Sequence, residues 1–369
     1  MKISFIRGAY LNNFEGQNFD FTHQTSFDFR GYSSLFPLDA HVPFPIVRLP
    51  SITDIPLIAK PVRFVANRTL GDTQLLFGLE RHITSSDIVH TADPHYYYSY
   101  QAALLRQNGM IKKLITTWWE TIAFNNEGTS AKKRIKKFVM QHTDLFLCYT
   151  ERAKQCLLDE GVAHDKIAVI PLGVDLAKFY PMAKKNAVPT ILFAGRLVQE
   201  KGILDLYDAF LNIKKQNIVA KLRIVGSGPL EGELRSRIME DKLADAVSIE
   251  KRTYEEMPKI YREADIFCVP SKKTKTWEEQ YGMVFIEAMA SGLPIVSYRT
   301  GAIPEVVGEC GLFADEGDIS VLTASIIQII RARELGAKLG TMGREQAANR
   351  YDAKRTALQI AKLYTTLCK

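Results

Sequence analysis

Short runs of apolar residues alternate along the chain with longer segments in which apolar residues recur every three or four positions. The runs span four to six residues, as buried strands do, and the longer segments have the spacing of amphipathic helices. In the second half we predict strands at 190–193, 221–225, 247–250, 266–270 and 294–297, with helices between them. Such alternation predicts parallel sheets covered by helices, with ligands at the carboxyl ends of the strands.

The first half of the chain shows the same alternation with less regularity. The predicted strands lie at 2–7, 87–90, 114–117, 145–149 and 167–170. The segment 8–19, which contains Gly16, is predicted to be a loop. The segment 18–76 is rich in Phe, Pro and Thr and shows no periodicity from which its elements can be placed.

The length of 369 residues fits two domains of ordinary size. We place them at 1–174 and 175–350, with a polar hinge at 175–189 and a C-terminal helix, 351–369, that packs on the first domain. The apolar fraction of 46% and the charged fraction of 24% are typical of a globular protein. No apolar run approaches the ~18 residues of a membrane span. The five scattered cysteines indicate reduced thiols in a cytoplasmic protein.

Part of the net charge of +7 is concentrated at 132–137, where basic residues are interleaved with apolar ones. Together with Ile135, Phe138 and Val139, this pattern predicts an amphipathic basic helix. Its basic face is either a solvated surface or a contact for an anionic membrane, which would make the protein peripheral on the cytoplasmic face. No nucleic-acid-binding motif is present, so nucleic acid is not a predicted partner.

The segment 279–294 has the most informative pattern in the chain. Glu279 and Glu287 stand eight positions apart, and Gly282 lies where a loop pattern changes to a helical one. Helical spacing begins at Met283, and a Gly-Leu-Pro sequence ends it. One acid therefore precedes the helix and the other lies about a turn inside it. The free backbone N–H groups between them suit a bound diphosphate. The alternative is a buried helix with two incidental glutamates.

Polar and glycine-rich loops follow the other strands of this half. Arg196 and Lys201, in the loop after the first strand, can both reach an anion at the end of that strand. Gly226 opens a turn after the second strand, Ser271 follows the fourth, and 300–307 follows the fifth. Because the carboxyl ends of parallel strands meet at one edge of a sheet, we expect these loops to lie together.

Five sequences in this half occur in the order and spacing of one enzyme family: FAGRLVQEKG, VGSGPL, VPS, EEQYGMVFIEAMASGLPIV and TGAIPEVV. Together they resemble the nucleotide-sugar domain of the family-4 retaining glycosyltransferases, over 171–311. The resemblance implies the α/β architecture called GT-B, in which two Rossmann-like domains face each other across a cleft. The first domain would bind the acceptor and the second the nucleotide sugar, and the last helix would return to the first domain.

The resemblance also implies roles for matching residues. Arg196 and Lys201 would hold the donor diphosphate, Glu279 would bind the donor sugar, and these three are the predicted catalytic residues. Glu287 would bind the ribose, and Gly16 would approach the diphosphate from the other domain. The predicted donor-binding residues are Gly16, Gly195, Gly226, Arg252, Tyr281, Gly282, Met283, Val284 and Glu287.

A glycoside hydrolase also uses two carboxylates, so it has to be weighed as an alternative. If Glu279 and Glu287 were both helical, their backbones would lie about 12 Å apart along the axis. A retaining hydrolase needs its carboxyls about 5.5 Å apart and an inverting one within about 9.5 Å, and neither needs a basic pair. A transferase, in which cations stabilise a departing nucleoside diphosphate, is favoured. Neither a metal site nor a cofactor is predicted.

The acceptor side is less clearly defined. Members of the family often carry a histidine in a Thr-x-His pattern, where this chain has Thr117-Trp118-Trp119. The candidate acceptor-side residues are His95, Trp119 and Glu120, and the alternative is that they are structural.

The predicted function is metal-independent, retaining transfer of a hexosyl group from a UDP- or GDP-sugar to a hydroxyl of a glycan, lipid or small molecule. Two alternatives stay open. One is a catalytically silent, membrane-associated protein that binds sugar nucleotides. The other is a GT-B phosphorylase or sugar-phosphate synthase.

Overall fold

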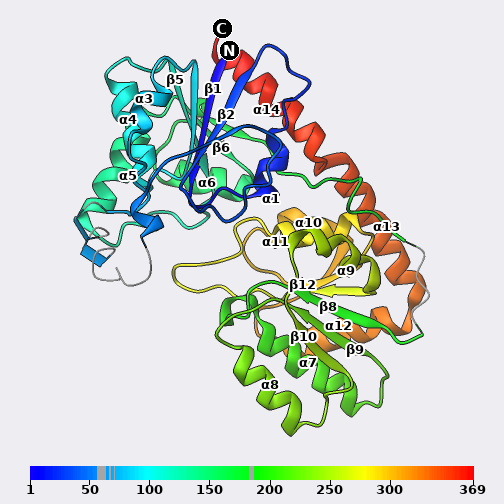
Figure 1. Cartoon of the computed structure of the whole chain (residues 1–369). Helices are drawn as coiled ribbons and strands as arrows, with labels where there is room; N and C mark the ends of the chain where they lie inside the picture. The colour runs from blue at the N-terminus through cyan, green and yellow to red at the C-terminus, as the bar shows by residue number, and fades with distance from the viewer. Residues whose placement is uncertain (56–63, 66–67, 70, 183–186) are drawn as a thin grey trace. The chain divides into compact units, whose positions relative to one another are not determined.

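The computed structural model describes residues 1–55, 64–65, 68–69, 71–182 and 187–369, so part of the predicted hinge, 183–186, lies outside the described residues. The described chain forms two compact units (Figure 1). The first comprises Met1–Leu172 together with Ala353–Lys369, and the second comprises Gly173–Asp352. The structure does not determine how the two units are placed relative to each other, so each is described by itself.

The first unit is built on a parallel sheet whose described strands follow the order β3–β2–β1–β4–β5–β6–β7. The strands are β1 (Lys2–Gly8), β2 (Asp28–Ser33), β3 (Ile46–Arg48), β4 (Ile88–Ala92), β5 (Lys113–Trp118), β6 (Leu145–Cys148) and β7 (Ile167–Val169). The central strand β4 is buried along its whole length. Because both faces of a parallel sheet are covered, its inner strands are rich in apolar residues, which is why the sequence pattern indicates most of them.

The helices of the first unit are α1 (Asn13–Gly16), α3 (Leu79–Ile83), α4 (Tyr97–Gln107), α5 (Ser130–His142), α6 (Glu151–Asp159) and α14 (Ala353–Leu367). Helix α5 is the predicted basic helix, and it starts where the Thr129 side chain accepts a hydrogen bond from the N–H of Lys132. Ile135 and Val139 are buried in the core, with Phe138 packed against it. The apolar side of α5 is therefore not available to a membrane.

The last helix, α14, belongs to the first unit although it follows the second unit in the chain (Figure 1). The Tyr364 side chain is fully buried, and its hydroxyl lies 2.6 Å from Nδ1 of His90 in β4. The Tyr364 ring also packs edge-on against Phe21, with ring centroids 5.9 Å apart. Helix α14 is thus anchored directly to a central strand of this sheet.

The second unit has a parallel sheet whose described strands follow the order β10–β9–β8–β11–β12–β13. The strands are β8 (Thr190–Ala194), β9 (Lys221–Val225), β10 (Val247–Glu250), β11 (Ile266–Cys268), β12 (Ile295–Tyr298) and β13 (Gly311–Ala314). The helices are α7 (Ile203–Lys215), α8 (Glu231–Glu240), α9 (Met257–Glu263), α10 (Met283–Ala290), α11 (Ile303–Val307), α12 (Ile319–Arg331) and α13 (Arg333–Arg350).

The predicted fold class is confirmed, since each unit is a Rossmann-like α/β layer structure with a parallel sheet. The predicted domain boundaries, after 174 and after 350, lie two residues from the division in the structure. Within the described parts of the chain, every helix is too short or too polar to cross a bilayer.

Candidate active site

Strands β8 and β11 are parallel neighbours in the second sheet, and the order in which successive strands are added to the sheet reverses between them. From β8 the chain continues outward to β9 and β10, and from β11 it continues outward to β12 and β13. In open α/β sheets such a switch point leaves a crevice outside the carboxyl ends of the strands, and ligands bind there. The loops after β8 and β11 meet at this point, since the N–H of Lys272 donates to the carbonyl of Glu200 at 2.8 Å.

Lys201 and Glu279 form an ion pair at the switch point. The Lys201 Nζ donates to Oε2 of Glu279 at 2.6 Å, and the Ser271 hydroxyl donates to the same oxygen at 2.9 Å. The two charged side chains are only 14% and 8% exposed, and partial burial strengthens the attraction between them. Two predicted catalytic residues that stand 78 positions apart are thus in direct contact.

Neighbouring groups hold both partners of this ion pair. The Glu279 carbonyl accepts a hydrogen bond from the N–H of Ala302 at 2.8 Å. The Lys201 Nζ lies 5.0 Å from the ring centroid of Trp277, a cation–π contact. A cation and a carboxylate fixed in this way are preorganised for a polar ligand.

Helix α10 begins next to Glu279. Its N-cap is Gly282, whose φ of 80° is a left-handed conformation that glycine adopts without strain. A Cβ at this position would lie 2.5 Å from Cδ2 of Phe285 and 3.4 Å from Cγ of Glu279. The N–H groups of Met283 and Val284, in the first turn, have no carbonyl partner within the helix. The positive end of α10 therefore lies beside the ion pair.

Glu287 lies in the second turn of α10, and its carboxyl is in a very different environment from that of Glu279. It is buried, and its Oε2 accepts a hydrogen bond from the Tyr261 hydroxyl at 2.7 Å. Burial raises the pKa of Glu287 to about 7, although the hydrogen bonds from Tyr261 and Tyr254 act to lower it. The two glutamates are thus an ion-paired carboxylate and a largely desolvated carboxyl, not a matched pair.

The glycines after β8 and β9 allow these two loops to pack together. The Gly195 N–H donates to the carbonyl of Val225 at 3.0 Å. A Cβ on Gly226 would overlap the carbonyl oxygen of Gly195, so only glycine fits there.

The other predicted donor-binding residues differ in exposure. Tyr281 is buried directly before α10. Arg196 is exposed, and among the residues that the structure describes no ion pair involves it. Arg252 is exposed and pairs with Glu250 and, at 3.4 Å, with Glu256. The structure thus brings together Lys201, Glu279 and the start of α10, and leaves the two arginines on the surface.

The prediction that Gly16 lies in a loop is wrong. Residues 13–16 form the short helix α1, because the Asn12 side chain caps it by accepting a hydrogen bond from the N–H of Glu15 at 2.9 Å. A Cβ on Gly16 would lie 2.7 Å from Cγ1 of Val42, so close packing within the first unit is one reason for glycine here. Its role at the diphosphate stays a prediction.

The acceptor-side candidates follow β4 and β5, which are neighbours in the first sheet. Glu120 is buried, and its Oε1 accepts hydrogen bonds from the N–H groups of Thr121 and Ile122 at 2.9 and 3.1 Å. Its Oε2 accepts from the amides of Asn125 and Asn126 at 2.8 and 2.9 Å. With four donors already bound, this carboxylate organises the 120–126 turn.

Trp119 and His95 lie close to this turn in the same unit. The Trp119 ring packs edge-on against Tyr149, with centroids 4.5 Å apart, and the backbone N–H of Trp119 donates to Oδ1 of Asp93 at 3.1 Å. His95 is buried, and burial, with the charges of Lys132 and Lys136, lowers its pKa to about 3. His95 is therefore neutral near pH 7.

Comparison with known proteins decides the family. Residues 178–346 match the family described as glycosyl transferases group 1, and residues 37–178 match glycosyltransferase family 4. The chain belongs to the family-4 glycosyltransferases. It is 29% identical over 233 residues to the MMP alpha-(1->4)-mannosyltransferase of Mycolicibacterium hassiacum, a match that covers 62% of this chain and 55% of that protein.

Two solved structures are similar to this glycosyltransferase over its whole length. The sucrose-phosphate synthase from Thermosynechococcus elongatus superposes with a TM-score of 0.76 at 20% identity, covering 99% of this chain and 98% of that one. HepE of Anabaena, solved in complex with UDP-glucose, superposes with a TM-score of 0.76 at 16% identity, covering 99% and 100%. At these identities the likeness shows the fold alone.

A buried cluster of charged side chains in the first unit of this glycosyltransferase was not predicted from the sequence. Arg7, at the end of β1, donates to both carboxylate oxygens of Glu15 at 2.8 and 2.9 Å. The Tyr149 hydroxyl donates to Glu15 at 2.7 Å, and Arg7 also donates to Oγ1 of Thr117 at 2.9 Å. The signal for this cluster is a charged residue, Arg7, directly after the apolar pair Phe5-Ile6 of the predicted strand at 2–7.

Asp93, Ser271 and Trp277 were also given no role from the sequence. Asp93 is buried at the carboxyl end of β4, and burial raises its pKa to about 7. Ser271 and Trp277 contact the Lys201–Glu279 pair, as described above. No motif in their local sequence marks these residues as part of a site.

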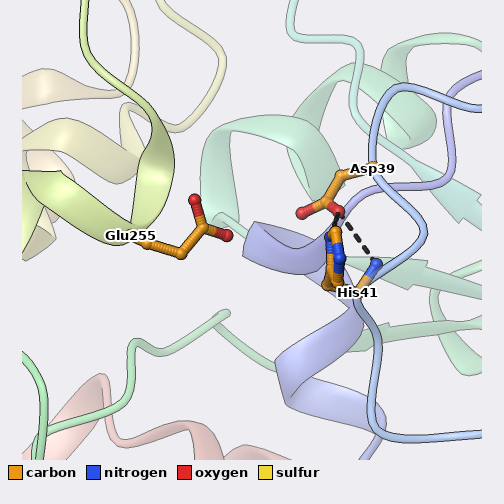
Figure 2. A group of neighbouring side chains, drawn as sticks. All are labelled: Asp39, His41 and Glu255. Carbon is orange, nitrogen blue, oxygen red and sulfur yellow. Dashed lines mark hydrogen bonds and ion pairs between the residues drawn. The ribbon is translucent and has the colours of Figure 1, made fainter.

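One further polar pair lies in the segment between β2 and β3. The Asp39 carboxylate accepts a hydrogen bond from the N–H of His41 at 2.8 Å and lies 2.9 Å from its Nδ1 (Figure 2). Glu255, drawn in the same figure, belongs to the second unit, and the placement of the units relative to each other is not determined. No metal site is therefore assigned to these three residues.

Glu287 predicts a pH dependence of stability for this glycosyltransferase. Its pKa is about 7 in the folded state and 4.5 ordinarily, so its stabilising contribution is complete below about pH 4.5 and is lost as the pH rises through 7. We expect the difference in melting temperature between the wild type and Glu287→Gln to decrease as the pH rises from about 5 to about 8. The corresponding free energy is on the order of 1–3 kcal/mol.

Thermal unfolding at several pH values measures this difference. Glu309→Gln, at an exposed position, is the control, and its difference from the wild type should not change with pH. A Glu287→Gln difference that is equally constant would contradict the prediction.

Proposed function

We propose that this glycosyltransferase moves a hexosyl group from a UDP- or GDP-sugar to a hydroxyl of a glycan, lipid or small molecule. The proposed reaction retains the anomeric configuration and needs no metal ion. The observation that carries the proposal is the contact between Lys201 and Glu279 at the switch point of the second sheet, beside the start of α10. A cation, a carboxylate and a helix N-terminus in one place match the phosphates and hydroxyls of a nucleotide sugar.

In this proposal Lys201 and the N–H groups of Met283 and Val284 bind the diphosphate. The Lys201 ammonium has three N–H donors, so it can bind phosphate while it stays near Glu279. Glu279, oriented by Ser271, accepts hydrogen bonds from hydroxyls of the hexose. Arg196, exposed in the loop after β8, supplies a second cation to the diphosphate.

Glu287 completes the proposed donor site from inside α10. With Tyr261 it binds the ribose hydroxyls. Its buried carboxyl offers both a donor and an acceptor while it is protonated, and only acceptors once it ionises.

Transfer breaks the bond between the anomeric carbon and the phosphate oxygen and forms a bond to the acceptor oxygen. The electron pair of the broken bond stays on the departing diphosphate. Lys201 and α10 stabilise the growing negative charge on the diphosphate more strongly than they stabilise the bound donor. This difference lowers the barrier. The acceptor attacks from the face that the diphosphate leaves, so the acceptor proton passes to the departing phosphate oxygen. Glu279 then orients the sugar and forms no covalent bond to it.

The relatives support the substrate class. HepE is solved in complex with UDP-glucose, which supports a nucleotide-sugar donor. The relative from Mycolicibacterium hassiacum is named a mannosyltransferase, which supports transfer of a hexose.

A thermal-shift screen of UDP-, GDP- and ADP-sugars, with the free nucleoside diphosphates as controls, tests the proposal. A ligand that binds only the folded state, present at about 100 times its Kd, adds about 2.7 kcal/mol to stability and raises the melting temperature. We expect a UDP- or GDP-sugar to give the largest shift, and its turnover to be unchanged in EDTA. No shift with any nucleotide sugar would refute the proposal. A shift without transfer or slow donor hydrolysis would favour the silent binding protein.

A further inference from the structure

A pocket of about 510 Å³ lies beside helix α5 in the first unit, and none of its lining residues is one assigned to the donor. Its apolar lining includes Phe124, Met140, Phe146 and Val162. Its volume is within the range of about 300–1,000 Å³ that is usual for ligand sites. Its rim carries the lysines Lys133, Lys137 and Lys166. The pocket thus combines an apolar interior with a basic entrance.

Phe124 is held at this pocket in a strained and exposed position. Its φ is 61°, in the left-handed region that bulky residues rarely adopt, and its side chain is 60% exposed. Its N–H donates to Oε1 of Glu160 at 2.7 Å, which fixes the strained loop. Backbone strain of this kind persists where the surrounding structure enforces it, and it is concentrated at functional positions.

The charges at the pocket divide into a buried group and an exposed group. Lys136 is 3% exposed and pairs with Glu160 at 2.7 Å and with Glu127 at 3.2 Å. Glu127 also pairs with Lys133 at 3.0 Å, so the two acids are neutralised by these two lysines. Lys137 and Lys166 are exposed, and in the described parts of the chain neither takes part in an ion pair. A net positive charge therefore remains at the entrance.

We propose that this pocket docks the protein on a membrane surface by binding an anionic phospholipid. Lys137 and Lys166 bind the lipid phosphate, and the apolar part of the lipid lies against Phe124 and the pocket lining. Charge complementarity favours an anionic lipid, and the exposed Phe124 favours one with an apolar chain over a free phosphate. The apolar side of α5 takes no part, because it is buried in the core.

Sedimentation with vesicles of phosphatidylcholine alone, and of phosphatidylcholine mixed with phosphatidylglycerol, tests this proposal on the full chain. We expect binding to the mixed vesicles only. Each lysine near an anionic surface contributes about fivefold to partition, so Lys137→Gln/Lys166→Gln should weaken binding about 25-fold. The matched control is Lys215→Gln/Lys338→Gln, which removes two exposed lysines of the second unit and should leave binding within about twofold.

Phe124→Gly separates lipid binding from folding. It removes the apolar side chain and relieves the strained backbone, so partition should fall about tenfold while the melting temperature stays the same or rises. Asn217→Gly, where φ is 56°, relieves a similar strain far from the pocket and should leave partition unchanged.

Three results would overturn the proposal. The first is no binding of the wild type to mixed vesicles, and the second is equal binding to neutral ones. The third is equal loss of binding in a pocket variant and its matched control. The readout does not involve sugar transfer, so failure here is distinguishable from failure of the proposed function.

Discussion

Replacing Lys201 by methionine is expected to lower the rate of donor turnover about 10²- to 10³-fold. Methionine is unbranched like lysine and one atom shorter, and it lacks the charge that pairs with Glu279 at 2.6 Å and that, in the proposed reaction, stabilises the departing diphosphate. Glu279→Gln should reduce turnover to a similar extent while most of the affinity for the free diphosphate is kept. Steady-state kinetics with the donor found by thermal shift measures both effects.

The double variant Lys201→Met/Glu279→Gln tests whether the two residues act together. Because they are in contact, the combined loss should be clearly smaller than the product of the single losses. The control is Lys272→Met, a nearby lysine that binds Asp205 at 2.9 Å, and its rate should stay within about threefold of the wild type. Near-normal turnover in Lys201→Met or in Glu279→Gln would remove that residue from the mechanism.

Replacing Arg7 by methionine is expected to destabilise the protein by about 3–5 kcal/mol, the largest stability effect that we predict. The Arg7 and Glu15 side chains are 2% and 4% exposed, so the variant leaves the Glu15 carboxylate buried without its cation. Arg7→Met/Glu15→Gln removes both charges and should recover part of the loss. Urea unfolding followed by tyrosine and tryptophan fluorescence measures the change.

An exposed ion pair on the neighbouring strand provides the control for this experiment. Arg30 lies 3.1 Å from Asp28, and both side chains are more than half exposed. Arg30→Met should therefore change the free energy of unfolding far less than Arg7→Met does. A loss in Arg7→Met no greater than that in Arg30→Met would mean that the buried pair contributes little to stability.

The apolar pattern predicts the bounds of several elements of the second unit. The strands at 221–225 and 247–250 have the predicted bounds, and the predicted helix start at Met283 is also observed. Strands β11 and β12 are buried along their whole length, so an apolar run identifies them. Strands β9 and β10 carry the exposed Lys221 and Ser248, and the alternation of polar and apolar residues identifies them instead.

Some elements of the first unit were not predicted, because their sequences show no clear apolar pattern. Strand β2 contains Arg30 and Gly31, and β3 is a three-residue edge strand that follows Pro45, so neither has an apolar run. Helix α4 begins with Tyr97 and Tyr98, aromatic residues with modest helix propensity, and packing against the core stabilises it.

The donor site shows a second limit of prediction from sequence. The resemblance assigned roles to Lys201 and Glu279 separately, but their contact depends on the switch point that places β8 beside β11. Ser271 and Trp277 contact this pair through the same loops, and nothing in their local sequence indicates it. At Gly16, by contrast, the Asn12-x-x-Glu15 spacing does indicate a helix start. The loop prediction was wrong because it did not take this spacing into account.

The return of α14 to the first unit sets an order of events during protein synthesis. All of the second unit, Gly173–Asp352, leaves the ribosome before the first residue of α14 does. The second unit is continuous in the chain and can complete its contacts at once. The first unit has to wait with Nδ1 of His90 lacking its Tyr364 partner and with the surface for Tyr364 open to water. Released chains that end at Asp352 would therefore carry a finished second unit and an unfinished first one, which is the form that chaperones would recognise.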